Sequence, residues 1–184
     1  MFQKLLKKIA RELLKQNIPY MVVGGQAVLL YGEPRLTRDI DITLGIGIDG
    51  LDNIRSIVET LKLKSLAANV EKFVKETMVF PVMDEKSGIR VDFIFSFSPY
   101  EKQAIARAKD IKFGKFAVKF ASLEDVVIHK IIAGRARDIE DVKSIFLKNP
   151  DYDSDYIEKW LAEFDRSLSE NFSEKFKALV EKLK

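Results

Sequence analysis

Residues 24–42 read GGQAVLLYGEPRLTRDIDI and place a glycine pair ahead of two aspartates, Asp39 and Asp41. Residues i and i+2 of a β-strand project from the same face, with Cα atoms about 6.6 Å apart. Hard cations such as Mg²⁺ bind carboxylate oxygens and usually keep a substrate phosphate in their shell. The two aspartates could therefore hold one or two divalent ions, although many Asp-x-Asp pairs are only solvated strand ends.

A third acid lies in a second apolar segment. Residues 89–95 read IRVDFIF, in which Asp92 is the sole acid. An acid in such a strand costs free energy unless it is paired or binds a metal. One interpretation is that Asp92 joins Asp39 and Asp41 at a metal site, and the other is that Arg90 or a backbone amide satisfies it. We favour the metal site because a strand, a glycine pair and a helix precede the first two acids.

The glycine pair suggests a phosphate site, although a glycine pair after a strand is usually only a turn. The apolar residues 19–23 form an expected strand that ends at Gly24 and Gly25, and residues 26–31 can form a short helix. Glycines let the backbone approach phosphate oxygens closely, and the amides at a helix N-terminus point toward them. Neither a P-loop lysine nor a dinucleotide-binding glycine motif is present.

The three acids together suggest a mechanism for phosphoryl chemistry. Two divalent ions about 3.5–4 Å apart, bridged by Asp39 and Asp41, would clamp the attacking and leaving oxygens of an in-line displacement. Asp92 would complete the shell of the ion that holds the incoming hydroxyl, and it could accept the hydroxyl proton.

The composition indicates a globular protein with one main core. The chain has 184 residues, of which 47% are hydrophobic and 32% charged, and it has no cysteine. The absence of cysteine excludes disulfides and thiolate catalysis. The apolar runs are far shorter than the ~20 residues of a membrane span. We therefore expect no membrane association and a cytoplasmic location, with the basic helix at residues 2–16 packed on a sheet rather than on lipid.

Charge is unevenly distributed along the chain. Residues 151–184 contain nine acidic and six basic side chains, which leaves a balance of +6 for residues 1–150 within the total of +3. The mildly basic region of residues 1–150 suits an anionic ligand such as a nucleotide or RNA.

Hydrophobic periodicity predicts an α/β (α+β) fold, with a mixed β-sheet core flanked by helices and followed by a C-terminal helical region. Helices are expected over residues 2–16, 26–31, 48–63, 99–109, 122–133, 138–149, 154–168 and 173–183. Strands are expected over residues 19–23, 40–44, 78–83, 89–97, 111–113 and 116–120. The change from strands to helices near residue 121 predicts a catalytic core of residues 1–121 and a helical region of residues 122–184 packed on it.

The glycine pair, the motif Arg35-x-Thr37-x-Asp39-x-Asp41 and the strand acid Asp92 resemble the nucleotidyltransferase superfamily of DNA polymerase beta-like fold. The AbiEii-like toxin nucleotidyltransferases and related small proteins are the most similar branch. The resemblance implies transfer of a nucleoside monophosphate from an NTP such as ATP, with Mg²⁺ or Mn²⁺, to a hydroxyl of a protein, of RNA or tRNA, or of a small molecule. A toxin role would imply an antitoxin partner. The alternative is an inactive member of the fold that binds nucleotide or a protein.

The resemblance extends into the helical region. AbiEii-like proteins carry a helical lysine followed by an Arg-Asp pair and a further aspartate, which Lys130, Arg137, Asp138 and Asp141 match. By analogy Lys130 would hold the triphosphate, and Asp138 or Asp141 would order that lysine or the site. Two plainer interpretations remain open. Lys130 could be a solvated helix residue, and Arg137 with Asp141 could be an i, i+4 surface ion pair.

Three residues of the motif flank the acids. Arg35 and Arg38 could bind phosphate or could offset the charge of an acidic site. The hydroxyl of Thr37 is expected to fix the turn before the strand. The single histidine, His129, is expected to serve packing or to lie at the surface.

Overall fold

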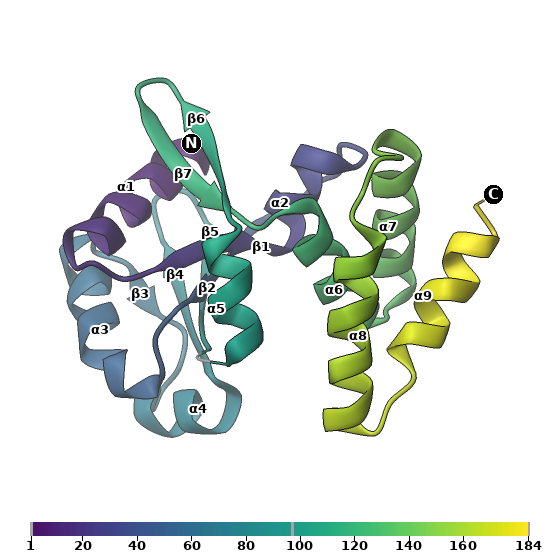
Figure 1. Cartoon of the computed structure of the whole chain (residues 1–184). Coiled ribbons are helices and arrows are strands. Elements are labelled where there is room, and N and C mark those ends of the chain that lie inside the picture. Colours follow the sequence, from purple (N-terminus) through teal and green to yellow (C-terminus); the bar gives the residue numbers. More distant parts are fainter. Residues whose placement is uncertain (1, 97, 184) are drawn as a thin grey trace. The chain divides into compact units, whose positions relative to one another are not determined.

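The structure, a computed structural model, describes residues 2–96 and 98–183 (Figure 1). The chain forms two compact units. The first contains the residues up to Gln26 together with Leu36–Ala121, and the second contains Ala27–Arg35 together with the residues from Ser122 onward. The division into folding domains of residues 1–121 and 122–184 stays a prediction.

The first unit is built on one mixed sheet. Its strand order is β3-β4-β5-β2-β1-β7-β6, and β1 runs parallel to β7 as β2 does to β5, whereas all other neighbours are antiparallel. The strands are β1 (Tyr20–Val23), β2 (Asp39–Leu44), β3 (Lys64–Ser65), β4 (Val79–Asp84), β5 (Ile89–Phe95), β6 (Lys109–Phe113) and β7 (Phe116–Phe120). The predicted mixed α/β fold is confirmed.

Alternation along β2 and β5 explains why these two segments are central strands. Alternate residues of the two strands lie on one face, and six apolar side chains there are at most 2% exposed: Ile40, Ile42, Leu44, Val91, Phe93 and Phe95. The polar side chains fall on the other face, because successive residues of a strand point in opposite directions. A register shift of one residue would bury the acids and expose this core, so packing fixes the register.

Helices cover the sheet of the first unit. They are α1 (Phe2–Lys15), the start of α2 (Gly24–Tyr31), the short 3₁₀ helix η1 (Ile48–Gly50), α3 (Leu51–Thr60), α4 (Val70–Thr77) and α5 (Pro99–Ala106). Helix α1 packs against β7 and α3, and α4 packs against β4. The side chains of Asn69 and Ser98 cap α4 and α5. The prediction that the basic helix packs on a sheet is confirmed.

The structure differs from the expected elements in several places. Helix α2 begins at Gly24 rather than at residue 26, and the expected helix of residues 48–63 divides into η1 and α3, which ends at Thr60. Strand β3 and helix α4 were not predicted. The expected helix of residues 99–109 ends at Ala106, because β6 already begins at Lys109. The expected strand through residue 97 ends at Phe95, and Phe97 lies outside the described residues.

The second unit is helical throughout. It contains the remainder of α2, then α6 (Leu123–Ala133), α7 (Ala136–Lys148), α8 (Ser154–Leu168) and α9 (Phe172–Glu181). Helix α6 packs against α7, α8 and α9. Ser122 caps α6, and Gly134 ends it in the left-handed conformation that favours glycine. The buried carboxylate of Asp125 accepts hydrogen bonds from the hydroxyls of Ser122 and Tyr156 at 2.7 and 2.9 Å.

Within the described residues, none of the helices has both the length and the apolar character needed to cross a lipid bilayer.

Gly24 stands where the backbone passes close to Asp41. Its φ is +63°, which costs a non-glycine residue about 1–2 kcal/mol. A β-carbon at this position would lie 2.8 Å from Cγ of Asp41 and still closer to the carboxylate oxygen Oδ2. Glycine at residue 24 therefore permits both the turn into α2 and the approach of the chain's own carboxylate.

We expect Gly24→Ala to destabilise the first unit by more than the backbone conformation alone explains, because Asp41 must also move. Gly88→Ala is the matched control, since Gly88 has φ +67° and a β-carbon there would meet nothing within 4 Å. Urea unfolding of both variants gives the comparison. Equal losses of unfolding free energy would show that the close approach of Asp41 carries no cost.

Candidate active site

The pairing of β2 with β5 brings the three predicted acids to one face of the sheet. Asp41 lies opposite Asp92, and Asp39 lies opposite Arg90, in the parallel register of the two strands. Directly opposed residues of neighbouring strands project on the same side of a sheet. Asp39 is exposed, whereas Asp41 and Asp92 are half-buried.

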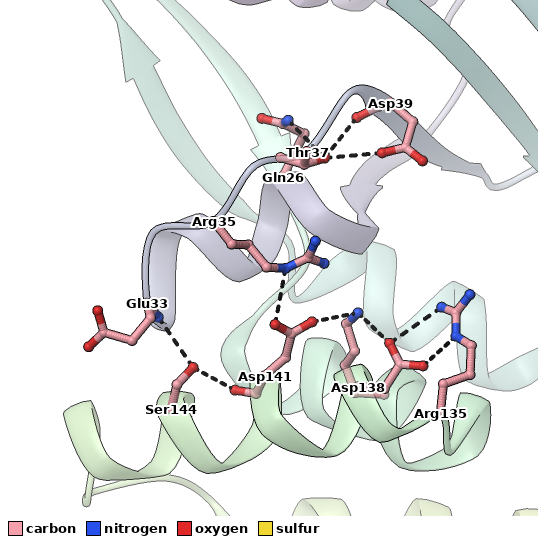
Figure 2. Close-up of polar contacts among 10 residues, drawn as sticks. Gln26, Glu33, Arg35, Thr37, Asp39, Arg135, Asp138, Asp141 and Ser144 are labelled. Carbon is pink, nitrogen blue, oxygen red and sulfur yellow. Dashed lines mark hydrogen bonds and ion pairs between the residues drawn. The ribbon is translucent and has the colours of Figure 1, made fainter.

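Thr37 and Gln26 position the first acid. The hydroxyl of Thr37 donates to Oδ1 of Asp39 at 3.1 Å, and the side-chain amide of Gln26 donates to the same hydroxyl at 3.4 Å (Figure 2). Thr37 thus contacts the acid itself, in agreement with the local role expected for it. Gln26 was missed, because nothing in the sequence relates a residue in α2 to one that follows eleven positions later.

Asp92 binds the arginine two residues before it. Nε of Arg90 donates to Oδ1 of Asp92 at 2.8 Å, and the side chains are 49% and 17% exposed. The pKa of the Arg90 guanidinium is raised, first by this hydrogen bond and, more weakly, by the charges of Asp92, Asp39 and Asp41. Arg90 therefore lies in the field of all three acids. The second interpretation of Asp92 given above, in which Arg90 satisfies the acid, anticipated this contact.

The donor chemistry of this face fits a hard divalent cation, since it offers three carboxylates on two adjacent strands. As the side chains stand, no three acidic or histidine groups of the described residues converge on a point that would hold a metal ion. Asp39 contacts Thr37, and Asp92 contacts Arg90. The metal site stays a prediction.

The second unit contains a buried ionic cluster around Lys130, whose side chain is only 8% exposed. Nζ of Lys130 lies 2.6 Å from Oδ1 of Asp138 and 2.9 Å from Oδ2 of Asp141. Arg35 and Arg135 complete it. Nε of Arg35 lies 3.0 Å from Oδ1 of Asp141, and Nε of Arg135 lies 2.6 Å from Oδ2 of Asp138. Three cations thus share two carboxylates.

The cluster keeps Asp138 ionised. Burial would raise the pKa of Asp138, but the hydrogen bonds from Arg135 and Lys130 outweigh it and hold the pKa below its ordinary value. The idea that Lys130 is a solvated residue is wrong, since it is buried. Asp141 is not in a surface pair either, because it is 6% exposed and binds Lys130 and Arg35.

The other predicted residues lie as follows. Gly25 is buried in the first turn of α2, and Arg38 is exposed immediately before β2. Arg137 is exposed near the start of α7, and His129 is half-buried in α6. Arg135 was not assigned a role in advance, although its i, i+3 spacing to Asp138 is the spacing of neighbours on a helix.

We expect Lys130→Met to cost about 3–5 kcal/mol of unfolding free energy, because it leaves two buried carboxylates with reduced compensation. Lys143→Met is the matched control on α7, where Lys143 pairs at 2.6 Å with the exposed Glu140. This surface pair should be worth less than about 1 kcal/mol. Chemical unfolding of both variants measures the difference, and a loss in Lys130→Met as small as in the control would contradict the structural importance of the cluster.

Comparison with solved structures identifies the fold. The crystal structure of ANT(2'')-Ia in complex with adenylyl-2''-tobramycin is 19% identical, with a TM-score of 0.62 over 92% of this chain and 100% of that one. The lincosamide adenylyltransferase LnuA, with lincomycin bound, is 16% identical with a TM-score of 0.54 over 77% and 94%. A nucleotidyltransferase-like protein from Paracoccidioides brasiliensis is 17% identical with a TM-score of 0.55 over 89% and 87%. At these identities the likeness establishes the fold alone.

Comparison with curated proteins gives no match. Among protein families, the one described as "Nucleotidyltransferase of unknown function (DUF6036)" matches residues 2–183. The resemblance to nucleotidyltransferases is therefore confirmed, while the narrower assignment to the AbiEii-like branch stays a prediction. The chain belongs to this nucleotidyltransferase family of unknown function.

Proposed function

We propose that the protein is a metal-dependent nucleotidyltransferase that moves a nucleoside monophosphate from an NTP to an acceptor hydroxyl. The observation that carries this proposal is the β2–β5 register, which sets Asp41 beside Asp92 with Asp39 on the same face. Family membership supports nucleotide transfer as the reaction class. The acceptor would be a protein, an RNA or tRNA, or a small molecule.

Asp39, Asp41 and Asp92 would hold the metal, either Mg²⁺ or Mn²⁺. Such an ion, when bound, neutralises phosphate charge and lowers the pKa of a bound hydroxyl. The acceptor oxygen would form a bond to the α-phosphorus while the bond to the pyrophosphate oxygen breaks. The hydroxyl proton would pass to the Asp92 carboxylate, and pyrophosphate would leave. Backbone amides at Gly24 and Gly25 would lie against the phosphates.

The basic residues of the motif receive separate roles in the proposal. Arg35 and Arg38 would bind phosphate oxygens, since a guanidinium can contact them with two donors. Lys130 already contacts two carboxylates, so the contacts support a positioning role for Asp138 and Asp141 toward this lysine. A toxin role with an antitoxin partner rests on the AbiEii-like resemblance alone.

A second candidate is a protein of this fold that binds nucleotide, or a protein partner, without turnover. The ion pair of Arg90 with Asp92 favours it, because it occupies one of the three expected metal ligands. Thermal unfolding with each NTP and Mg²⁺ distinguishes the candidates when combined with a transfer assay. Ligand at 100 times its Kd adds about 2.7 kcal/mol to stability. Stabilisation without transfer to any acceptor would favour the binding protein.

Replacement of Asp41 by asparagine should abolish transfer from α-labelled NTPs to total RNA or cell protein, because the amide removes a negatively charged metal ligand. Asp52→Asn is the matched control, since Asp52 is an 89% exposed acid in the same unit. We expect the control to retain full transfer. Unchanged transfer by Asp41→Asn would refute the proposed site.

Removal of the competing arginine should strengthen metal binding. We expect Arg90→Gln to bind Mn²⁺ about tenfold more tightly in the absence of nucleotide, which is the Coulomb estimate for a divalent ion about 6 Å from a unit charge in water. Electron paramagnetic resonance of free Mn²⁺ measures this directly. Arg55→Gln, in helix α3, is the control. Equal affinity in Arg90→Gln and the parent protein would show that the arginine does not oppose a cation.

A further inference from the structure

Positive charge is concentrated in two segments of the first unit. Residues 2–15 and residues 107–119 each contain five basic side chains and one acidic side chain, a balance of +4 in each. The whole chain carries only +3, so the remaining residues sum to −5. The two segments thus differ in sign from the rest of the molecule.

Helix α1 presents its charge as a stripe. Lys4, Lys8, Arg11 and Lys15 are exposed and recur at intervals of four, three and four residues, which places them on one helical face. At 1.5 Å per residue the stripe is about 17 Å long. The opposite face is buried, including Leu6, Ile9 and Leu13. This helix therefore has no free apolar face with which to enter a lipid surface.

The β6–β7 hairpin adds charge next to aromatic rings. Lys112 and Lys115 are exposed on either side of Gly114, which has φ +70° at the turn. Phe113 and Phe116 oppose each other across the two strands and are half-buried. Basic side chains beside accessible aromatic rings are typical of surfaces that bind single-stranded nucleic acid.

The helix and the hairpin form one surface. Cζ of Arg11 lies 5.0 Å from the ring centroid of Phe116, so the middle of the stripe contacts the start of β7. Figure 1 shows α1 beside this hairpin, in agreement with the packing of α1 on β7. The charges are spread over the surface rather than gathered around a point, which suits an extended polyanion better than a small anion.

We infer that the α1 stripe and the β6–β7 hairpin bind the phosphodiester backbone of a single-stranded nucleic acid. If the proposed function holds, this surface delivers the acceptor hydroxyl of that nucleic acid, which distinguishes it from a protein or a small-molecule acceptor. Binding itself requires neither the metal nor the NTP.

Fluorescence anisotropy of labelled 20-nucleotide oligouridylate, with oligothymidylate as a second probe, tests the inference. Lys4→Glu/Lys8→Glu alters the stripe, and Lys112→Glu/Lys115→Glu alters the hairpin. Lys72→Glu/Lys75→Glu is the matched control on α4, where the two exposed lysines lie between Glu71 and Glu76. Each double variant lowers the net charge by four, so overall charge is the same in all three.

We expect the stripe and hairpin variants to lose at least about tenfold in affinity at low salt, with the control unchanged. The slope of log affinity against log salt should fall by about 1.4 for two lost contacts to a single strand. RNA bound more tightly than DNA would show that the surface prefers RNA. Equal losses in all three variants, no binding by the parent protein, or binding to phosphatidylserine vesicles in place of both oligonucleotides would overturn the inference.

Asp41→Asn separates this inference from the proposed function. Retained RNA binding with no nucleotide transfer supports both. Retained binding together with unchanged transfer refutes the catalytic acids and leaves the binding surface intact. Loss of RNA binding in Asp41→Asn would overturn the inference, because Asp41 lies outside both basic segments.

Discussion

The parallel pairing of β2 with β5 is the constraint on which the candidate site depends. Asp41 and Asp92 come from segments fifty residues apart in sequence, and only this register brings them side by side. The register is fixed from the opposite face, where Ile42 and Phe93 are fully buried. A slip of one residue would exchange the two faces, so the apolar core determines the position of the acids.

This arrangement brings together like charges that the first unit must accommodate. The structure does so with neighbouring groups: Thr37 donates to Asp39, Arg90 donates to Asp92, and Gly24 leaves room for Asp41. Each of these features accommodates one acid, and a sheet without acids on one face would not need it. The acids of this face are therefore accommodated by groups of the first unit itself.

The central strands and most of the helices could be predicted, because alternation and helical periodicity extend over many residues in those segments. The same alternation predicted that the three acids lie on one face of their strands. Strand β3 has only two residues, so it gives no periodic signal. Helix α4 is short, but Val70, Phe73 and Val74 have helical spacing, so its signal was present in the sequence. The contact of Gln26 with Thr37 depends on how the chain folds, which local pattern does not show. The contact of Arg90 with Asp92 spans only two residues and was one of the two interpretations of the sequence. The burial of Lys130 can also be predicted from the sequence. Helix α6 is apolar on almost every side, and such helices are buried.

The buried cluster limits what Lys130 can do in any phosphate chemistry. The Lys130 ammonium lies 2.6 and 2.9 Å from carboxylate oxygens of Asp138 and Asp141. An ammonium has three donors, of which the hydrogen bond to Asp138 uses one. The contact with Oδ2 of Asp141 is an ion pair that does not have hydrogen-bond geometry. A phosphate oxygen that took Lys130 from either aspartate would leave that buried carboxylate with one cation, Arg135 for Asp138 or Arg35 for Asp141. Weaker compensation of a buried charge is costly. The contacts therefore favour a lysine held in a fixed position over a flexible one that follows the nucleotide.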